Sequence, residues 1–144
     1  MKKKIIFGVI LLLITGLIIF TSTRSQQDHI NEGDVVAKFI NQYIFSGRLT
    51  DTELSNLKTS VGAKLLGHFS LYALDGLFAY LFVNQFKFKN KFKIFFVVFF
   101  GLALASCGEV IQLFAVERYS SFNDVIINYS GYLLPLLLIK LSKI

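Results

Sequence analysis

The sequence predicts an all-α fold, a polytopic membrane bundle of four transmembrane helices, on three observations. Hydrophobic residues make up 54% of the 144 residues, only 17% are charged, and the apolar residues are gathered into long blocks. Apolar runs of this length are typical of membrane-spanning helices, so the pattern argues against a soluble enzyme. The content of aromatic residues, 15%, argues against a disordered chain, and the length favours one domain over residues 1–144. The expected spans are about 5–21, 63–83, 94–116 and 125–139, with an outer loop at 22–62.

The first block, Ile5–Phe20, follows a basic start that is also typical of a secretory signal peptide. The next residues, Thr21 to Arg24, make a poor cleavage site, so we expect an uncleaved first helix. The block is about 24 Å long at 1.5 Å per residue, which is short for a span. We therefore expect the span to extend into the threonines that follow.

The distribution of lysines predicts how the chain is oriented. Three short segments carry lysines and no acidic residue: the start of the chain, the turn between the second and third spans, and the end of the chain. Short cytoplasmic loops accumulate Lys and Arg, so both termini are expected in the cytoplasm. Because topology explains the basic charge, we expect no nucleic-acid partner.

The outer loop contains two patterns typical of short helices. One is an apolar stripe with helical spacing, which predicts a helix that Asn31 or Asp34 caps and Gly47 ends. The members of the stripe are Val35, Val36, Phe39, Ile40, Tyr43 and Ile44. The other is a capping box from Thr50 to Glu53, which opens a second helix. We expect these amphipathic helices to lie on the outer membrane surface or on the rim of the bundle.

Three of the expected spans each carry one polar face. Ionisable groups inside a membrane need a partner or a function, so these faces are expected to meet inside the bundle. Counting residues from the outer boundary places most of them in the outer leaflet, with Asp75 alone near the middle of the membrane. The candidate site residues are Lys64, His68 and Tyr72 of the second span, Glu109 and Gln112 of the third, Arg118 of the loop, and Asp124 and Asn128 of the fourth.

These candidates also have plain structural interpretations. Gln112 and Asn128 are of the type that holds membrane helices together by hydrogen bonds. His68 and Glu109 either pair with each other or with Lys64, or they act as general base and acid. The sequence shows no metal-binding motif and no cofactor-binding motif, so we expect neither a metal nor a cofactor.

The polar positions resemble the VanZ-like family of small bacterial membrane proteins. The resemblance runs from Lys64 to Pro135 and rests on the pattern K-x3-H-F-x2-Y followed by E-x2-Q-x5-R-x5-D-x3-N-x2-G. It implies a single VanZ-like domain in the bacterial plasma membrane. Some members lower susceptibility to teicoplanin and related lipoglycopeptides, which act on a lipid-linked cell-wall precursor at the outer face. The chain departs from the family pattern at Asp75, where an apolar residue is expected, and at Val116-Glu117, where Pro-Gly is usual.

Three hypotheses follow. In the first, the outward polar site binds a membrane lipid, a lipid-linked cell-wall precursor or the lipoglycopeptide, with Lys64 and Arg118 meeting phosphate or carboxylate. In the second, the protein is an intramembrane enzyme that modifies a lipid-linked envelope substrate through His68 and Glu109. In the third, it is a structural scaffold of the envelope, and the polar residues only hold the bundle together.

Overall fold

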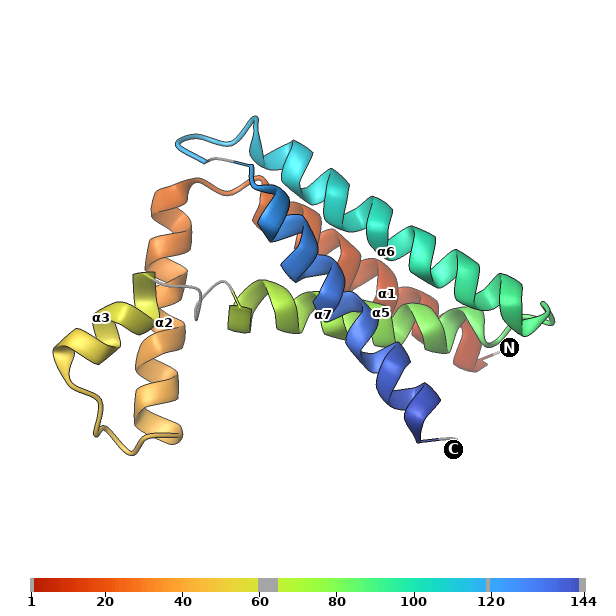
Figure 1. Ribbon diagram of the computed structural model, residues 1–144, viewed down its shortest axis with the longest axis horizontal. Helices are drawn as coiled ribbons and strands as arrows, with labels where there is room; N and C mark the ends of the chain where they lie inside the picture. The colour runs from red at the N-terminus through yellow and green to blue at the C-terminus, as the bar shows by residue number, and fades with distance from the viewer. Residues whose placement is uncertain (1, 60–64, 119, 143–144) are drawn as a thin grey trace.

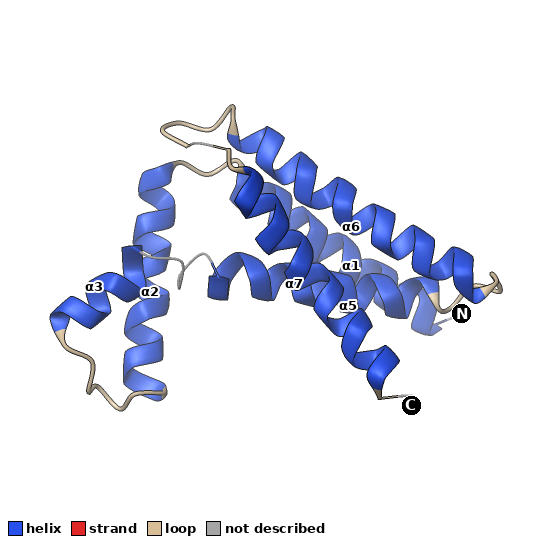
Figure 2. Ribbon diagram, viewed as in Figure 1, coloured by secondary structure: helices blue, strands red, loops and turns tan. Residues whose placement is uncertain are grey.

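The computed structural model describes residues 2–59, 65–118 and 120–142, and these residues form an all-helical chain (Figures 1 and 2). The elements in chain order are α1 (Lys2–Ser22), α2 (Gln26–Tyr43), α3 (Asp51–Thr59), the π-helical turn η1 (Leu65–Phe69), α5 (Ser70–Val83), α6 (Asn90–Gln112) and α7 (Phe122–Leu141). The all-α prediction is confirmed.

Among the described residues, three helices, α1, α6 and α7, are long and apolar enough to cross a membrane. Their apolar side chains point outward, as Leu12 (73% exposed) and Phe95 (61% exposed) illustrate, while several polar side chains are buried inside. An apolar exterior around a polar interior is expected of a multi-pass membrane protein. The predicted span at 63–83 corresponds to a shorter apolar helical stretch, Gly67–Val83, so a fourth crossing stays a prediction.

Helix α5 lies at the centre and packs against α1, α6 and α7. It comes very close to α7 at Gly76, where a Cβ atom would overlap the backbone carbonyl of Tyr132. Tyr132 is fully buried and belongs to the same apolar core as Tyr72 and Ala79. Small residues let two helix backbones touch, and in a membrane such van der Waals packing is a main source of helix association.

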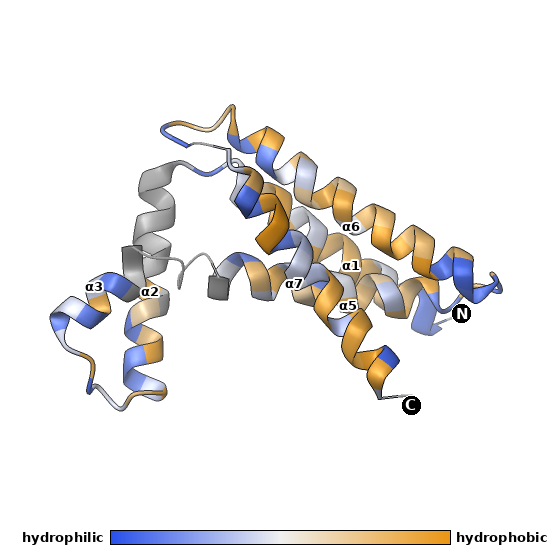
Figure 3. Cartoon of the chain, viewed as in Figure 1, coloured by the Kyte–Doolittle hydropathy of each residue, from blue (hydrophilic) through white to orange (hydrophobic). Residues whose placement is uncertain are grey.

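The two ends of the bundle differ in character. At one end the Lys4 ammonium lies 3.8 Å from the centre of the Phe86 ring, and Lys93 Nζ donates to Asn84 Oδ1 over 3.0 Å. The starts of α1 and α6 therefore meet the end of α5, and this lysine end is strongly hydrophilic in Figure 3. The opposite end carries the loop between α6 and α7 and is called the loop end below (Figure 1).

The helix α2 is longer than expected. It begins at Gln26, so Asn31 and Asp34 lie inside it and the prediction that either one caps the helix is wrong. Asp34 instead pairs with Lys38 one turn later over 2.6 Å. The apolar side chains of Val35, Phe39 and Tyr43 are exposed, and their placement on a membrane surface stays a prediction.

After Tyr43 the chain makes a tight turn. Gly47 has a φ of +74°, and its N–H donates to the carbonyl of Asn41 over 2.7 Å. A residue with left-handed backbone conformation is a common way to satisfy carbonyls at the end of a helix. The position of Gly47 past the helix end thus agrees with its expected role as a stop.

The capping box at the start of α3 is confirmed. The Thr50 N–H donates to Glu53 Oε2 over 2.9 Å, and the Glu53 N–H donates to Thr50 Oγ1 over 3.3 Å. These reciprocal bonds satisfy two of the donors that a helix start leaves open. The backbone N–H of Thr50, and to a smaller extent its hydroxyl, holds the pKa of Glu53 below its ordinary value of 4.5.

We expect acid to loosen the first turn of α3. Because folding lowers the pKa of Glu53, its carboxylate stabilises the helix start fully at pH values above its pKa in the unfolded chain. That stabilisation is lost as the pH falls through the pKa of Glu53 in the folded protein. Amide hydrogen exchange at Leu54, compared with a Glu53→Ala variant, should show extra protection at about pH 7 that disappears towards about pH 3. Equal protection in both proteins at every pH would contradict this.

Candidate functional site

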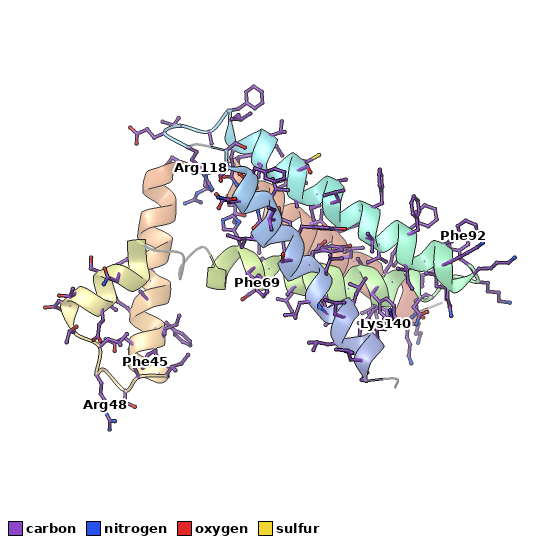
Figure 4. The ribbon with its side chains drawn as sticks, in the orientation of Figure 1. Phe45, Arg48, Phe69, Phe92, Arg118 and Lys140 are labelled. Atoms are coloured by element: carbon purple, nitrogen blue, oxygen red, sulfur yellow. The ribbon has the colours of Figure 1, made fainter. Side chains whose placement is uncertain are left out.

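Six of the predicted site side chains line one cavity at the loop end. His68 comes from η1, Glu109 and Gln112 from α6, Arg118 from the α6–α7 loop, and Asp124 and Asn128 from α7. Figure 4 shows Arg118 at this end, directed towards the bundle. The structure thus brings these six residues together around one cavity, and their role in binding stays a prediction. They are called the polar cluster below.

Glu109 is the acceptor at the centre of the polar cluster. Its Oε1 accepts from Gln112 Nε2 over 3.2 Å and from Asn128 Nδ2 over 3.4 Å. Its Oε2 accepts from the backbone N–H of Ser121 over 3.1 Å. Glu109 is only 2% exposed, and a buried carboxyl group is costly unless donors surround it. These three donors from α6, α7 and the loop offset that cost.

Arg118 ties the loop to two helices. Its Nη2 donates to Gln112 Oε1 over 2.7 Å, and its Nη1 makes a long contact of 3.5 Å with the carbonyl oxygen of Thr21 at the end of α1. The side chain is half-buried at the rim of the polar cluster. The structure thus places a guanidinium at the loop end, with a neutral amide and a backbone carbonyl among its partners.

The chain leaves α6 earlier than expected, and this brings the loop back onto the polar cluster. The helix ends at Gln112, four residues before the predicted end at Val116. The N–H groups of Leu113 and Phe114 bond to carbonyls three residues earlier, over 3.2 and 3.0 Å, which tightens the turn. Glu109 is therefore in the last turn of α6, about 5 Å from the end of the helix, whereas the expected end would have lain about 10 Å away.

The residue before Arg118 has an unusual backbone conformation. Glu117 has a φ of +58°, a region that costs an L-residue about 1–2 kcal/mol and that glycine adopts freely. This is the position at which the family pattern has the glycine of Pro-Gly. The backbone at Glu117 adopts the conformation that a glycine at this position would favour.

We expect Glu117→Gly to stabilise the folded protein by about 0.5–1 kcal/mol, because it relieves the left-handed conformation. The melting temperature in detergent should rise, whereas Glu117→Ala should give no such gain. A lower melting temperature for the glycine variant would show that the Glu117 side chain supports the loop.

The cavity inside the polar cluster is small. Its volume is about 10 Å³, roughly the space for one water molecule. His68 and Glu109 border the same space, as an acid–base pair requires. The space between them is nevertheless too small for a head group or a substrate in this arrangement. A larger ligand therefore has to contact the rim of the polar cluster, where Arg118 and Asp124 lie.

Two predicted site residues are not among these six. Tyr72 does not line the cavity; it is 1% exposed, and its hydroxyl packs against Gly108 of α6 as part of the core. Lys64 lies outside the described residues. In the described part of the chain, no group of three or more His, Cys, Asp and Glu residues is placed to hold a metal ion.

Asp75 forms a separate polar contact deeper in the bundle. It is fully buried, and its Oδ1 accepts from Thr15 Oγ1 of α1 over 2.8 Å. Its Oδ2 and the hydroxyl of Tyr132 have no hydrogen-bond partner among the described residues. The sequence singled out Asp75 but not Thr15, because one threonine within an apolar block is no signal by itself.

Comparison with known proteins identifies the family. No curated protein and no solved structure matches the chain. A family model described as VanZ/LLP1 matches residues 7–143, which include the first helix and the outer segment that carried no signature of their own. The chain therefore belongs to the VanZ/LLP1 family, and its apolar helices make it a VanZ-like membrane protein.

Proposed function

We propose that the protein lowers susceptibility to teicoplanin and related lipoglycopeptides by binding the drug or the lipid-linked cell-wall precursor at the outer membrane face. The supporting observation is the polar cluster, in which side chains from η1, α6, α7 and the loop meet at the end of the bundle opposite the lysines. Family membership makes this phenotype a reasonable expectation for the chain.

The proposal includes a topology. Both termini and the lysine end lie in the cytoplasm, as expected from the charge of short loops, and the loop end faces outward. The stretch from Leu65 to Val83 is then the fourth crossing. This stretch is short for a membrane span. Because α5 packs against α1, α6 and α7, the neighbouring helices cover much of its surface, and it does not have to match the thickness of the bilayer alone.

Arg118 is the residue best placed to meet an anionic group. A guanidinium matches the geometry of phosphate and carboxylate, and it stays charged under all physiological conditions. Gln112 and the Thr21 carbonyl fix its position, so little further ordering is required when a ligand arrives. Asp124 lines the same cavity and supplies an acceptor for hydroxyl or amide groups of a ligand.

The experiment is a susceptibility measurement in a teicoplanin-sensitive bacterium that expresses the protein. Expression should raise the inhibitory concentration, and Arg118→Gln should return it towards the value of the empty strain at matched protein abundance. Arg48→Gln, which removes an exposed guanidinium from the loop between α2 and α3, is the control and should have no effect. Retained protection in the Arg118 variant would exclude this residue from binding.

A second function, a structural scaffold of the envelope, is favoured by one observation. The polar groups of Glu109, Gln112, Asn128 and Arg118 bond to one another and leave a cavity of only about 10 Å³. Under this alternative, variants of the polar cluster lower the amount of protein in the membrane but leave the effect per molecule unchanged. Measuring abundance and inhibitory concentration together separates the two.

A further inference from the structure

A second and much larger cavity lies at the lysine end. It has a volume of about 470 Å³ and is bordered by the end of α5, the first half of α6 and the second half of α7. This volume is within the range of about 300–1,000 Å³ found for sites that hold small molecules. It lies at the other end of the bundle from the polar cluster, so it is independent of the function proposed above.

The path of α7 explains why the cavity exists. Near the middle of the bundle α6 and α7 are in close contact: the ring of Tyr132 lies so near Gly101 that a Cβ atom on this glycine would overlap it. Close to this point the Tyr129 hydroxyl donates to the carbonyl of Val98 over 3.4 Å. Beyond Val98 the two helices separate towards the lysine end (Figure 1), and Val98 itself borders the cavity.

The cavity has an apolar wall and a basic mouth. The wall is formed by Val98 of α6 and by Leu133, Leu136 and Leu137 of α7. The mouth carries the ammonium groups of Lys93 and Lys140 and the side-chain amides of Asn84 and Asn90. None of the residues that line it is acidic, so the positive charge is not neutralised within the cavity.

One amide at the mouth also positions a lysine. Asn84 Oδ1 accepts from Lys93 Nζ over 3.0 Å, and the Asn84 carbonyl lies 3.4 Å from the same ammonium. Asn84 follows α5, whereas Lys93 is in the first turn of α6, so the contact holds the ammonium at the junction of the two helices. An ammonium fixed in this way is a preorganised partner for an anion.

We propose that this cavity binds one anionic phospholipid, with the phosphate between Lys93 and Lys140 and an acyl chain along Val98, Leu133 and Leu136. A basic site between transmembrane helices is the chemistry that recognises an acidic lipid head group. The exposed lysines of the neighbouring turn, Lys87 to Lys91, add to the attraction. With the topology proposed above, the lipid belongs to the inner leaflet.

The absence of tryptophan from the sequence allows a direct test. Leu137 lines the cavity and Leu138 does not, although both side chains are 57% exposed. Full-length Leu137→Trp and Leu138→Trp variants would be placed in phosphatidylcholine nanodiscs that contain a minor fraction of brominated phosphatidylglycerol or brominated phosphatidylcholine. The readout is the ratio of tryptophan quenching by the anionic lipid to quenching by the neutral one.

We expect the ratio to exceed one at position 137 and to be close to one at position 138. Replacing Lys93 and Lys140 by Gln should weaken the preference about fivefold for each lysine removed, since one lysine near a membrane surface contributes about 1 kcal/mol. Replacing both by Arg should preserve it, which also shows that the fold survives a change at these positions.

A matched pair of exposed lysines provides the control. Replacing Lys87 and Lys91 by Gln removes the same charge from the same end but not from the cavity, so the ratio at position 137 should remain above one. Equal ratios at 137 and 138, or the same loss in the Lys87/Lys91 variant as in the Lys93/Lys140 variant, would overturn the proposal and indicate only a general attraction of acidic lipid.

Discussion

Gly76→Ala should destabilise the protein more than any other single methyl group added to its helices. The new Cβ would overlap the backbone carbonyl of Tyr132, and a backbone, unlike a flexible side chain, cannot move without displacing all of α7. Overpacking a well-packed core costs about 1–3 kcal/mol, and a clash with backbone belongs at the upper end of that range. We expect a clear fall in melting temperature and in the yield of protein in detergent.

Gly16→Ala is the matched control for this prediction. Gly16 is an exposed glycine within α1, and a Cβ atom there would meet nothing within 4 Å. The same methyl group should therefore raise the melting temperature slightly, because it meets no neighbour and alanine favours a helix over glycine by about 0.5–1 kcal/mol. If the Gly76 and Gly16 variants melted at the same temperature, α5 and α7 would not be in the close contact described above.

Glu109→Ala should have an effect of similar size at the loop end. It would leave Gln112 Nε2, Asn128 Nδ2 and the Ser121 N–H without their shared acceptor. Each buried donor left unsatisfied costs about 1–3 kcal/mol, so the loss amounts to several kcal/mol unless water enters the space. We expect lower abundance in the membrane and a lower melting temperature.

Glu109→Gln tests whether the carboxylate itself matters. The amide has the same shape and keeps one acceptor oxygen, but it presents a donor where the second acceptor was. It should therefore melt between the wild type and Glu109→Ala. A Gln variant as unstable as the Ala variant would show that both carboxylate oxygens are required, whereas a fully stable one would show that a single acceptor is sufficient.

The polar cluster could be predicted from sequence because membrane spans are so apolar that each buried polar side chain is conspicuous. The spacing of Glu109 and Gln112 along one helix, and of Asp124 and Asn128 along another, placed each pair on one face. The positions of the helix ends then placed the faces at a common level. Both steps use only helix geometry, which the surrounding structure rarely changes.

Other features of the site depend on contacts that leave no mark in the sequence. The donor from Ser121 is a backbone group, and every non-proline residue carries one. The early end of α6 at Gln112 follows from the way the loop folds back, since Leu113 to Val116 contain no residue that disfavours a helix strongly. The separation of α6 and α7 at the lysine end depends on packing around Tyr132, so periodicity alone could not predict the cavity there.

The contact between Thr15 and Asp75 has a consequence for engineering the protein. A buried carboxyl group on α5 takes the one hydrogen bond described above from Thr15 of α1, so the first helix is specific to this bundle and does more than tether it. A foreign anchor segment with only aliphatic side chains, grafted in place of residues 2–22, would reach the bilayer but leave that carboxyl group unsatisfied. Such a chimera should be inserted normally and then degraded, and restoring a hydroxyl at the position of Thr15 should rescue it.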